Sequence, residues 1–436
     1  MLWALPALVC VAAQAAQPVA GIEGTYADHT RAVQLARAGK YNDSLNILLP
    51  LLVRFPDDYP LQRDVILVTL WKGDCAGALQ RFERVYSRDE HPPYLVVPIS
   101  DCMLASNRPK EAHRLSRLAL AQHPNDESVR NAFVKADLAL RVDANVDEES
   151  PALDVALYND TSDQGLGEWY ARVEVSTLIF NATRLFASYL NVHSTESQYQ
   201  SGDMHRVGLG IRYRFNEQWH LEEELSTDLY QSGQGGSTTI LVYEPRDAWR
   251  LSAAYASFSV NTPLRARAAG ISSNQWSGDA SYEARDYRLS WVASINYYDF
   301  TDTNQRHAFY TAAGYAYEMR AEREQRLFVE WAQSSNTLDD AVYFNPSQDY
   351  SLGLTNRTDF IIDSHYRRHV DHLFLNANLY QQAGYGTHPR YGVRYEQDYD
   401  FDARHSLVAG AGVARNIYDG VYETDWRFYM YYHQRF

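Results

Sequence analysis

Carboxylate side chains recur at alternate positions in the C-terminal two-thirds of this 436-residue chain. Glu222 and Glu224 are separated by one residue, and so are Glu396 and Asp398. Residues two apart on a β-strand point to the same face, so each pair presents two negative charges to one side of a sheet. Rings of one charge bias which ions and polymers enter a pore. The pattern therefore predicts a conducting path that suits a cationic or neutral ligand.

Histidines are the other side chains that could do chemistry. His369, His372 and His405 lie near acids and could contribute to the Ser-His or Asp-His group of a hydrolytic site. The chain has no G-x-S-x-G motif and no ordered triad spacing. Its 14 histidines are scattered without the paired spacing of metal ligands. We therefore predict that the protein is not an enzyme and has no metal site and no cofactor.

The carboxylates lie in a region with the two-residue hydrophobic period of β-strands. Within residues 288–299, for example, Leu289, Trp291 and Ile295 share one face, and Ser290 and Asn296 share the other. The same alternation predicts sixteen strands, at 153–160, 169–179, 182–192, 205–215, 218–228, 237–244, 248–259, 273–284, 288–299, 306–318, 325–335, 349–361, 369–381, 389–399, 404–416 and 424–436. An even number of strands of about ten residues each is typical of a bacterial transmembrane β-barrel.

The connections between these strands alternate in length. Those after even-numbered strands are mostly short, whereas those after odd-numbered strands are generally longer and rich in Gly, Ser and Asn, as in 193–204, 260–272, 336–348 and 417–423. Barrels have short periplasmic turns and longer extracellular loops, so both termini are predicted to be periplasmic. A soluble β-sandwich or propeller is the alternative fold, but a propeller repeats its sequence in each blade, and no such repeat is visible.

Strand phase assigns side chains to the barrel interior. The predicted lumen residues, nine acids and one arginine, are Glu174, Glu222, Glu224, Asp228, Asp279, Glu283, Glu330, Arg394, Glu396 and Asp398. Each one alone could be a solvated wall residue, so the prediction depends on their common sign. Inward tyrosines such as Tyr431 could stack on sugar rings or fill volume. Glu223 does not fit, because it is in phase with the outward Trp219 and Leu225, which indicates a β-bulge or an error of register.

Residues 25–142, in front of the strands, have the 3.6-residue period of amphipathic helices. Gly39, Gly73 and Asn107 fall at predicted turns 34 residues apart, and a small residue follows five positions after each of them. A 34-residue helix–turn–helix period is that of the tetratricopeptide repeat. We predict about three such repeats, which either present a concave surface to a partner or act as a plain helical spacer. The acidic stretch 143–152 is predicted to be a linker to the barrel domain, residues 153–436.

Residues 1–15 are apolar and end in small residues, which predicts a secretory signal peptide. An exported protein folds in an oxidising compartment, so Cys75 and Cys102 could form a disulfide. Of the two alternatives we favour the other, in which the two thiols are buried separately on helices.

The two regions also differ in charge. Residues 1–150 hold all four lysines, whereas residues 151–436 hold none and carry 28 of the 33 tyrosines. Of the net charge of −15, the second region contributes −12, from 36 acids and 24 arginines. An acidic balance argues against nucleic acid as a partner. The predicted location is the bacterial outer membrane, with lipids around the barrel and the N-terminal region in the periplasm.

Five segments of the strand region carry a further signal, in the order TPLRARA (262–268), DDAVYFNPSQDYS (339–351), QQAGYGT (381–387), RYEQDYDFD (394–402) and YDG (418–420). Together they resemble the C-terminal barrel of the poly-β-1,6-N-acetylglucosamine export porin family, the PgaA type. The segments cover most of residues 240–436 and are specific as a group. Members of this family usually have a much longer repeat domain than the one predicted here.

The resemblance implies a periplasmic tetratricopeptide domain joined to a sixteen-stranded barrel that exports a biofilm exopolysaccharide. That polymer is partly de-N-acetylated and therefore cationic, and the helical repeats would engage a periplasmic polysaccharide deacetylase. Arg265 and Arg267, within TPLRARA, are candidates for a gating loop that either folds inward or stays outside. The alternative function is a barrel that anchors a periplasmic protein-binding scaffold and transports no polymer.

The last residue of the chain is aromatic and in phase with Trp426 and Phe428, which resembles the terminal strand that the outer-membrane assembly machinery recognises. We therefore expect Phe436→Ser to lower the amount of barrel in the outer membrane. The measurement is the yield of protein that migrates differently on gels before and after boiling, with Phe401→Ser, in a predicted turn, as the control. Normal assembly of the Phe436 variant would contradict the assignment.

Overall fold

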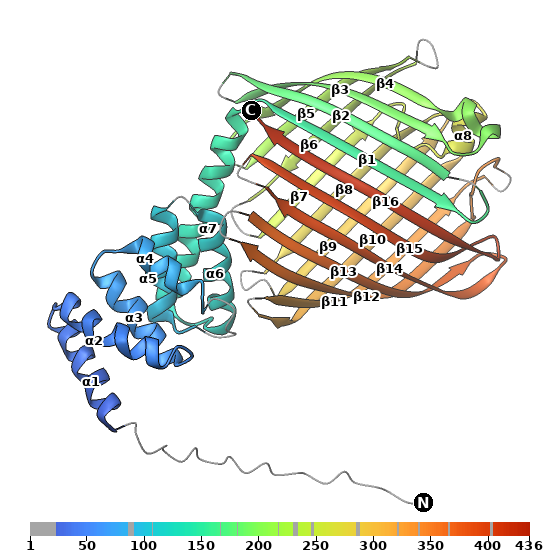
Figure 1. The fold of residues 1–436 in the computed structure, drawn as a ribbon. Helices are drawn as coiled ribbons and strands as arrows, with labels where there is room; N and C mark the ends of the chain where they lie inside the picture. Colours follow the sequence, from blue (N-terminus) through green and yellow to red (C-terminus); the bar gives the residue numbers. More distant parts are fainter. Residues whose placement is uncertain are drawn as a thin grey trace, which may run out of the picture. The chain divides into compact units, whose positions relative to one another are not determined.

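The computed structural model describes residues 23–85, 91–106 and 108–436, the last range with short gaps at 166, 181, 217, 230–233, 246–247, 285–287, 321, 339–340, 365–366 and 402–403. A helical region precedes a closed antiparallel barrel of sixteen strands (Figure 1). This confirms the predicted fold class. The predicted signal peptide, residues 1–15, lies outside the described residues.

The helices of the N-terminal region are α1 (Glu23–Arg37), α2 (Tyr41–Arg54), α3 (Tyr59–Trp71), α4 (Cys75–Phe82), α5 (Pro93–Ala105), α6 (Pro109–Gln122) and α7 (Glu127–Glu149). Gly39 and Gly73 turn the chain at φ of 76° and 86°, a conformation that glycine adopts without the strain of a β-carbon. Ser44, Ala78 and Ala112, at 34-residue intervals, are all fully buried where helices pack closely. No helix in the described part of the chain is both long and apolar enough to cross a bilayer.

The end of the helical region belongs to the barrel rather than to the preceding helices. Helices α6 and α7 form one compact unit with the barrel, and α1–α4 with most of α5 form another. Residues 143–149, predicted as part of a linker, form the last turns of α7. Acidic side chains do not break a helix, and this one ends before Pro151, because proline removes a backbone donor and disfavours helix at the residue before it.

Cys75 and Cys102 form a disulfide that joins α4 to α5. The preference for two separate thiols was therefore wrong. The packed helices place the two Cα atoms 5.5 Å apart, within the range of about 4.4–6.8 Å that a disulfide requires.

The barrel strands are β1 (Ala152–Ser162), β2 (Gly167–Phe180), β3 (Thr183–Ser194), β4 (Met204–Arg214), β5 (Trp219–Asp228), β6 (Gly235–Tyr243), β7 (Trp249–Ala256), β8 (Ser273–Glu283), β9 (Leu289–Phe300), β10 (Gln305–Met319), β11 (Arg323–Asn336), β12 (Gln348–Ser364), β13 (Arg367–Gln382), β14 (Gly386–Asp400), β15 (His405–Tyr418) and β16 (Val421–Arg435). Each strand pairs with the next, and β16 pairs with β1 to close the sheet. Closure leaves no unpaired edge, which a bilayer would not tolerate.

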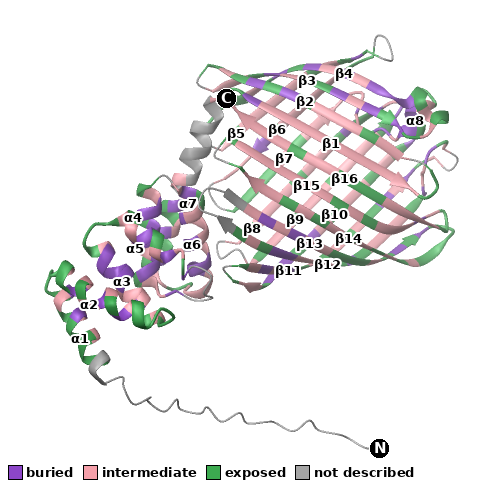
Figure 2. Cartoon of the chain, in the orientation of Figure 1, coloured by how far each residue is buried: buried purple, intermediate pink, exposed green. Residues whose placement is uncertain are grey.

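The two faces of the sheet alternate along every strand. Large apolar side chains such as Leu209, Leu225 and Ile295, exposed by 65%, 64% and 59%, lie on the outer face. Figure 2 shows exposed positions recurring along the strands. Exposure of this kind is expected where lipid, not water, contacts the wall.

The connection between the last two strands was predicted wrongly. Residues 417–423 were expected to form a long loop, but β15 and β16 are joined by Asp419 and Gly420 alone. Both residues have positive φ, 49° and 78°. Asp-Gly with two positive φ values is the tight turn that matches the twist of a hairpin.

Glu223 lies on the outer face without a bulge. The ladders from β4 to β5 and from β5 to β6 pass through Ile211, Glu223 and Thr239 without a shift of register. The Thr239 hydroxyl donates a hydrogen bond to the Glu223 carboxylate, which offsets part of the cost of removing it from water. Neither explanation suggested by the sequence is therefore needed.

The disulfide should stabilise the helical unit without affecting the barrel. It closes a loop of 27 residues. Closing such a loop lowers the conformational entropy of the unfolded chain, which stabilises the folded state by about 3 kcal/mol. We expect Cys75→Ser with Cys102→Ser to lower the free energy of unfolding of the helices by about that amount. Urea titration followed by helical circular dichroism measures it, with the boiling-dependent migration of the barrel as the control. An unchanged midpoint would show that the disulfide has no such role.

Candidate functional site

The register places all ten predicted lumen residues on one face of the closed sheet. Glu174 is opposed by Ser188, Ser188 by Gly208 and Gly208 by Ser226, so these residues share one face of the sheet. The strand pairing around the rest of the barrel places the other nine predicted residues on the same face. Arg172 on β2 and Glu224 on β5 are 3.0 Å apart although two strands lie between them. Only the concave inner face brings such residues together, so this face is the lumen.

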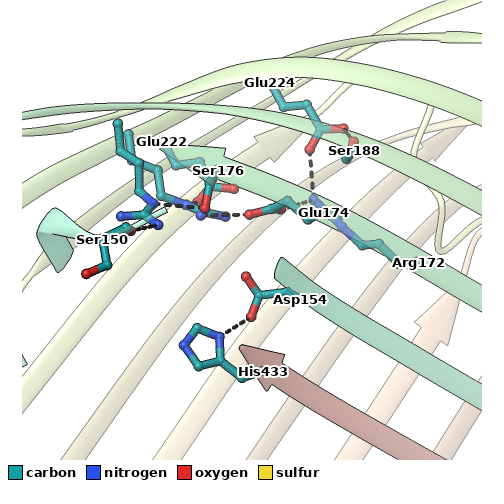
Figure 3. Close-up of polar contacts among 11 residues, drawn as sticks. Ser150, Asp154, Arg172, Glu174, Ser176, Ser188, Glu222, Glu224 and His433 are labelled. Carbon is teal, nitrogen blue, oxygen red and sulfur yellow. Dashed lines mark hydrogen bonds and ion pairs between the residues drawn. The ribbon is translucent and has the colours of Figure 1, made fainter. Parts of the chain in front are cut away.

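A network of alternating charges lines the lumen across β2, β4 and β5 (Figure 3). The Glu174 carboxylate, 5% exposed, lies 3.1 Å from Arg172 and 2.7 Å from Arg212. Arg212 also binds Glu222 at 2.6 Å, and Arg172 binds Glu224. Three predicted carboxylates are therefore paired with two arginines, which leaves a net charge of −1, and these side chains form part of the wall.

Gly208 leaves room for this network because glycine has no side chain. A β-carbon there would lie 2.2 Å from an oxygen of Glu224 and 2.6 Å from the Ser188 hydroxyl. Ser188 donates a hydrogen bond of 2.9 Å to the same carboxylate. The glycine thus lets Glu224 lie against the wall instead of projecting into the lumen.

A second network lies on β12, β13, β14 and β16. Asp359 accepts hydrogen bonds from Arg357 at 2.7 Å and from His372 at 2.6 Å. Tyr429 donates to Glu396, which lies 4.0 Å from His372. The hydrogen-bond partners of His372 among the described residues are Asp359 and Arg357.

The predicted ratio of nine acids to one arginine does not describe the lumen. The same register places further arginines inward, among them Arg172, Arg206, Arg212, Arg326 and Arg357. Strand phase could have found them, because they alternate with outward apolar residues in the same strands. These arginines are ion-pair partners of four of the nine predicted acids, Glu174, Glu222, Glu224 and Glu283.

Three predicted carboxylates remain without an ion pair among the described residues: Asp279, Glu330 and Asp398. Asp279 accepts one hydrogen bond of 3.2 Å from Ser252.

The other predicted residues have partners. Glu283 lies 3.9 Å from Arg326, and the Arg394 guanidinium lies 3.9 Å from the centre of the Phe374 ring. Asp228 is 3% exposed and accepts a long hydrogen bond of 3.4 Å from the backbone of His205.

Two tyrosines project from the lumen face with much of their surface free. Tyr431 is 50% exposed and Tyr310 is 37% exposed, and the register places both inward. The sequence analysis named Tyr431 but missed Tyr310, which the phase of residues 306–318 indicates. Exposed aromatic rings of this kind can stack on the apolar faces of sugars.

The connection between β7 and β8, residues 257–272, folds inward. Its Phe258 and Val260 pack against Leu190, Val192 and Met204, which lie on the lumen face of β3 and β4. The segment TPLRARA contains the short helix α8 (Leu264–Ala268). The sequence left open whether this loop folds inward or stays outside, and in the structure it folds inward.

Arg267 ties this loop to its neighbours. It is 5% exposed and donates to the carbonyl of Gly202 at 2.9 Å and to that of Thr262 at 2.6 Å. It also pairs with the Glu168 carboxylate on β2. Arg265, by contrast, is exposed and its guanidinium lies 5.4 Å from the centre of the Tyr199 ring.

Contacts continue from α8 across this end of the barrel. Ala266 clusters with Phe300 and Tyr343, and Phe344 meets Tyr418 of β15 with ring centres 5.2 Å apart. Burial raises the pKa of Tyr343 to about 12, so its hydroxyl stays protonated and donates to Asp302 at 3.1 Å. Three connections, after β3, β7 and β11, thus form one bridge, which we call the loop bridge, between β2 and β15.

Removing the Arg267 side chain should loosen the loop bridge, because one guanidinium joins three segments. We expect Arg267→Ala to raise the ion conductance of the purified protein in a planar bilayer, and Arg265→Ala, on the same helix, to leave it within about twofold of wild type. Equal conductance of the Arg267 variant and wild type would show that the loop bridge does not limit the pore.

Comparison with known proteins agrees with this geometry. A family model described as the PgaA membrane beta barrel domain matches residues 157–436. The solved structure titled "Bacterial polysaccharide outer membrane secretin" has a TM-score of 0.60 and 18% sequence identity over 66% of this chain and 99% of that one, which shows a shared fold.

Two curated relatives are similar over a shorter stretch. The poly-beta-1,6-N-acetyl-D-glucosamine export proteins of Escherichia coli K12 and O157:H7 are each 24% identical to the chain. Each match covers 45% of this chain and 27% of the relative. The chain thus matches about a quarter of the length of these relatives.

Proposed function

The chain belongs to the family of the PgaA membrane beta barrel domain and is an outer-membrane protein, and from this premise we propose that it exports poly-β-1,6-N-acetyl-D-glucosamine. The proposal extends to this chain the export function named for its curated relatives. The polymer would pass through the barrel as a passive conduit, without a chemical step.

The observation that carries the proposal is the set of unpaired carboxylates and exposed tyrosines on the lumen face. Asp279, Glu330 and Asp398 would meet the free amines of a partly deacetylated chain, and Tyr310 and Tyr431 would stack on its rings. Two unit charges 4 Å apart in water attract by only about 1 kcal/mol. Sites this weak favour entry but do not trap the polymer, as conduction requires.

The paired charges would have the complementary role. Each arginine that holds a wall carboxylate lowers the local charge, so the polymer meets a few separate attractive sites instead of a continuous acidic surface. A fully acidic lumen would hold a polycation at many points at once, and the summed attraction would oppose release.

Passage requires the loop bridge to move. We propose that α8, with Arg265 and Arg267, forms the mobile part of a gate at the extracellular end. The N-terminal helices would receive the polymer in the periplasm and would bind a polysaccharide deacetylase.

The test removes only the unpaired charges. We expect Asp279→Asn with Glu330→Gln and Asp398→Asn to assemble normally, to lose cation selectivity in bilayers and to export several-fold less polymer in a strain without its own exporter. Each single change should lower export by less than the triple change does, because two of the three weakly attracting carboxylates remain.

The matched control removes three carboxylates from the helical region, by Asp28→Asn, Asp57→Asn and Glu127→Gln, which are exposed. Selectivity and export equal to wild type in a well-assembled lumen triple variant would refute the proposed path. Lost selectivity with unchanged export would refute the electrostatic mechanism alone.

A further inference from the structure

A hollow of about 600 Å³ lies on the barrel wall across β7 to β12. Its lining includes Ala253, Gly278 and Ile295, which face one another in a single row of the register. The neighbouring Asp279 faces the lumen, so this row has the opposite phase and faces outward. Ile295 and Trp276, both of which line the hollow, are exposed by 59% and 56%. The hollow therefore opens toward the membrane.

The depth of the hollow comes from the small residues in its floor. Gly278 and Ala253 are paired on adjacent strands. The nearest atom that a β-carbon at Gly278 would meet is Cγ1 of Ile295, at 3.3 Å, and the nearest backbone atom, the Ser252 oxygen, is 3.9 Å away. A side chain at Gly278 would thus require only a small shift of the Ile295 side chain, and the backbone would not obstruct it.

Aromatic side chains form a wall on one side of this floor. Trp276 and Tyr297 are opposed on β8 and β9, and Tyr297 is opposed to His307 on β10. The rings of Tyr297 and His307 have centres 4.9 Å apart. A floor of small apolar residues beside an aromatic wall has the chemistry of a site for an acyl chain.

The lining becomes polar toward the loop end of the barrel. His307, Ser335 and Gln348 are opposed in one row and line the hollow. They lie within two residues of the loop ends of β10, β11 and β12, whereas Gly278 and Ile295 lie five residues from theirs. The hollow is thus apolar toward the middle of the membrane and polar toward its outer surface.

We propose that this hollow binds one lipid of the outer leaflet, with an acyl chain along Ala253 and Gly278 and a phosphate-bearing head group at His307, Ser335 and Gln348. The hollow is continuous with the lipid-facing surface of the barrel, and its polarity changes in the same direction as that of an outer-leaflet lipid. Histidine, hydroxyl and amide groups all donate hydrogen bonds to phosphate. The inference is independent of what passes through the lumen.

The experiment measures lipid retained by the full-length protein after purification from outer membranes in detergent. Native mass spectrometry of wild type, stripped of lipid and titrated with lipid A, should show one tightly held molecule. Gly278→Leu fills the floor and should weaken retention at least tenfold. Ala411→Leu adds the same side chain at an exposed outward position on β15 and should bind as wild type does.

The head-group contact is tested separately. His307→Ala should weaken binding of lipid A several-fold but leave binding of its dephosphorylated form unchanged. Phosphatidylglycerol in place of lipid A tests the source of the phosphate: tenfold weaker retention assigns the site to an acylated sugar phosphate, and equal retention assigns it to phosphate lipids in general.

Three results would overturn the proposal. They are retention by Gly278→Leu equal to that of wild type, loss of retention by Ala411→Leu to the same degree, and a bound mass equal to a second copy of the chain. Boiling-dependent migration on gels verifies in each case that the variant barrel has folded.

Discussion

The constraint on which the rest of this structure depends is that a backbone in a bilayer must satisfy its own hydrogen bonds. Lipid offers no partner to an exposed N–H or C=O, so the sheet can have no edge, and β16 returns to β1. Closure gives every strand one face toward lipid and one toward the lumen. The strict alternation of side chains, and with it the place of every charge, follows from that one requirement.

Charges confined to the inner face are close enough to neutralise one another. A carboxylate that faces lipid needs a partner to offset its removal from water, and the outward Glu223 has the Thr239 hydroxyl in that role. Inside, Arg172 and Arg212 hold Glu174 between them, and Gly208 makes space for Glu224. The lumen is therefore mostly a wall of paired charges, with a few carboxylates left free, and this division separates residues that hold the barrel from residues that could meet a ligand.

The loops at one end of the barrel make contacts that closure of the barrel does not require. Sixteen strands close without the inward course of residues 257–272, yet Arg267 is buried there and fastened to three segments. Leaving a buried guanidinium without its partners is costly, so these contacts hold residues 257–272 against β2 and against the connection after β3.

The sequence by itself determined the helical region, the sixteen strands and which residues of each strand face inward. Helices and strands have local periods that a sequence shows directly, and the membrane imposes the two-residue period on every strand of the barrel. The sequence could thus place Glu174 and Glu224 on the lumen face. Only the tertiary structure decided that Arg172 reaches Glu224 across two strands, that Phe258 and Val260 pack on the lumen face and that Cys75 meets Cys102. Those contacts join residues far apart along the chain, and their distances depend on how the barrel curves and how the helices pack, which no local pattern records.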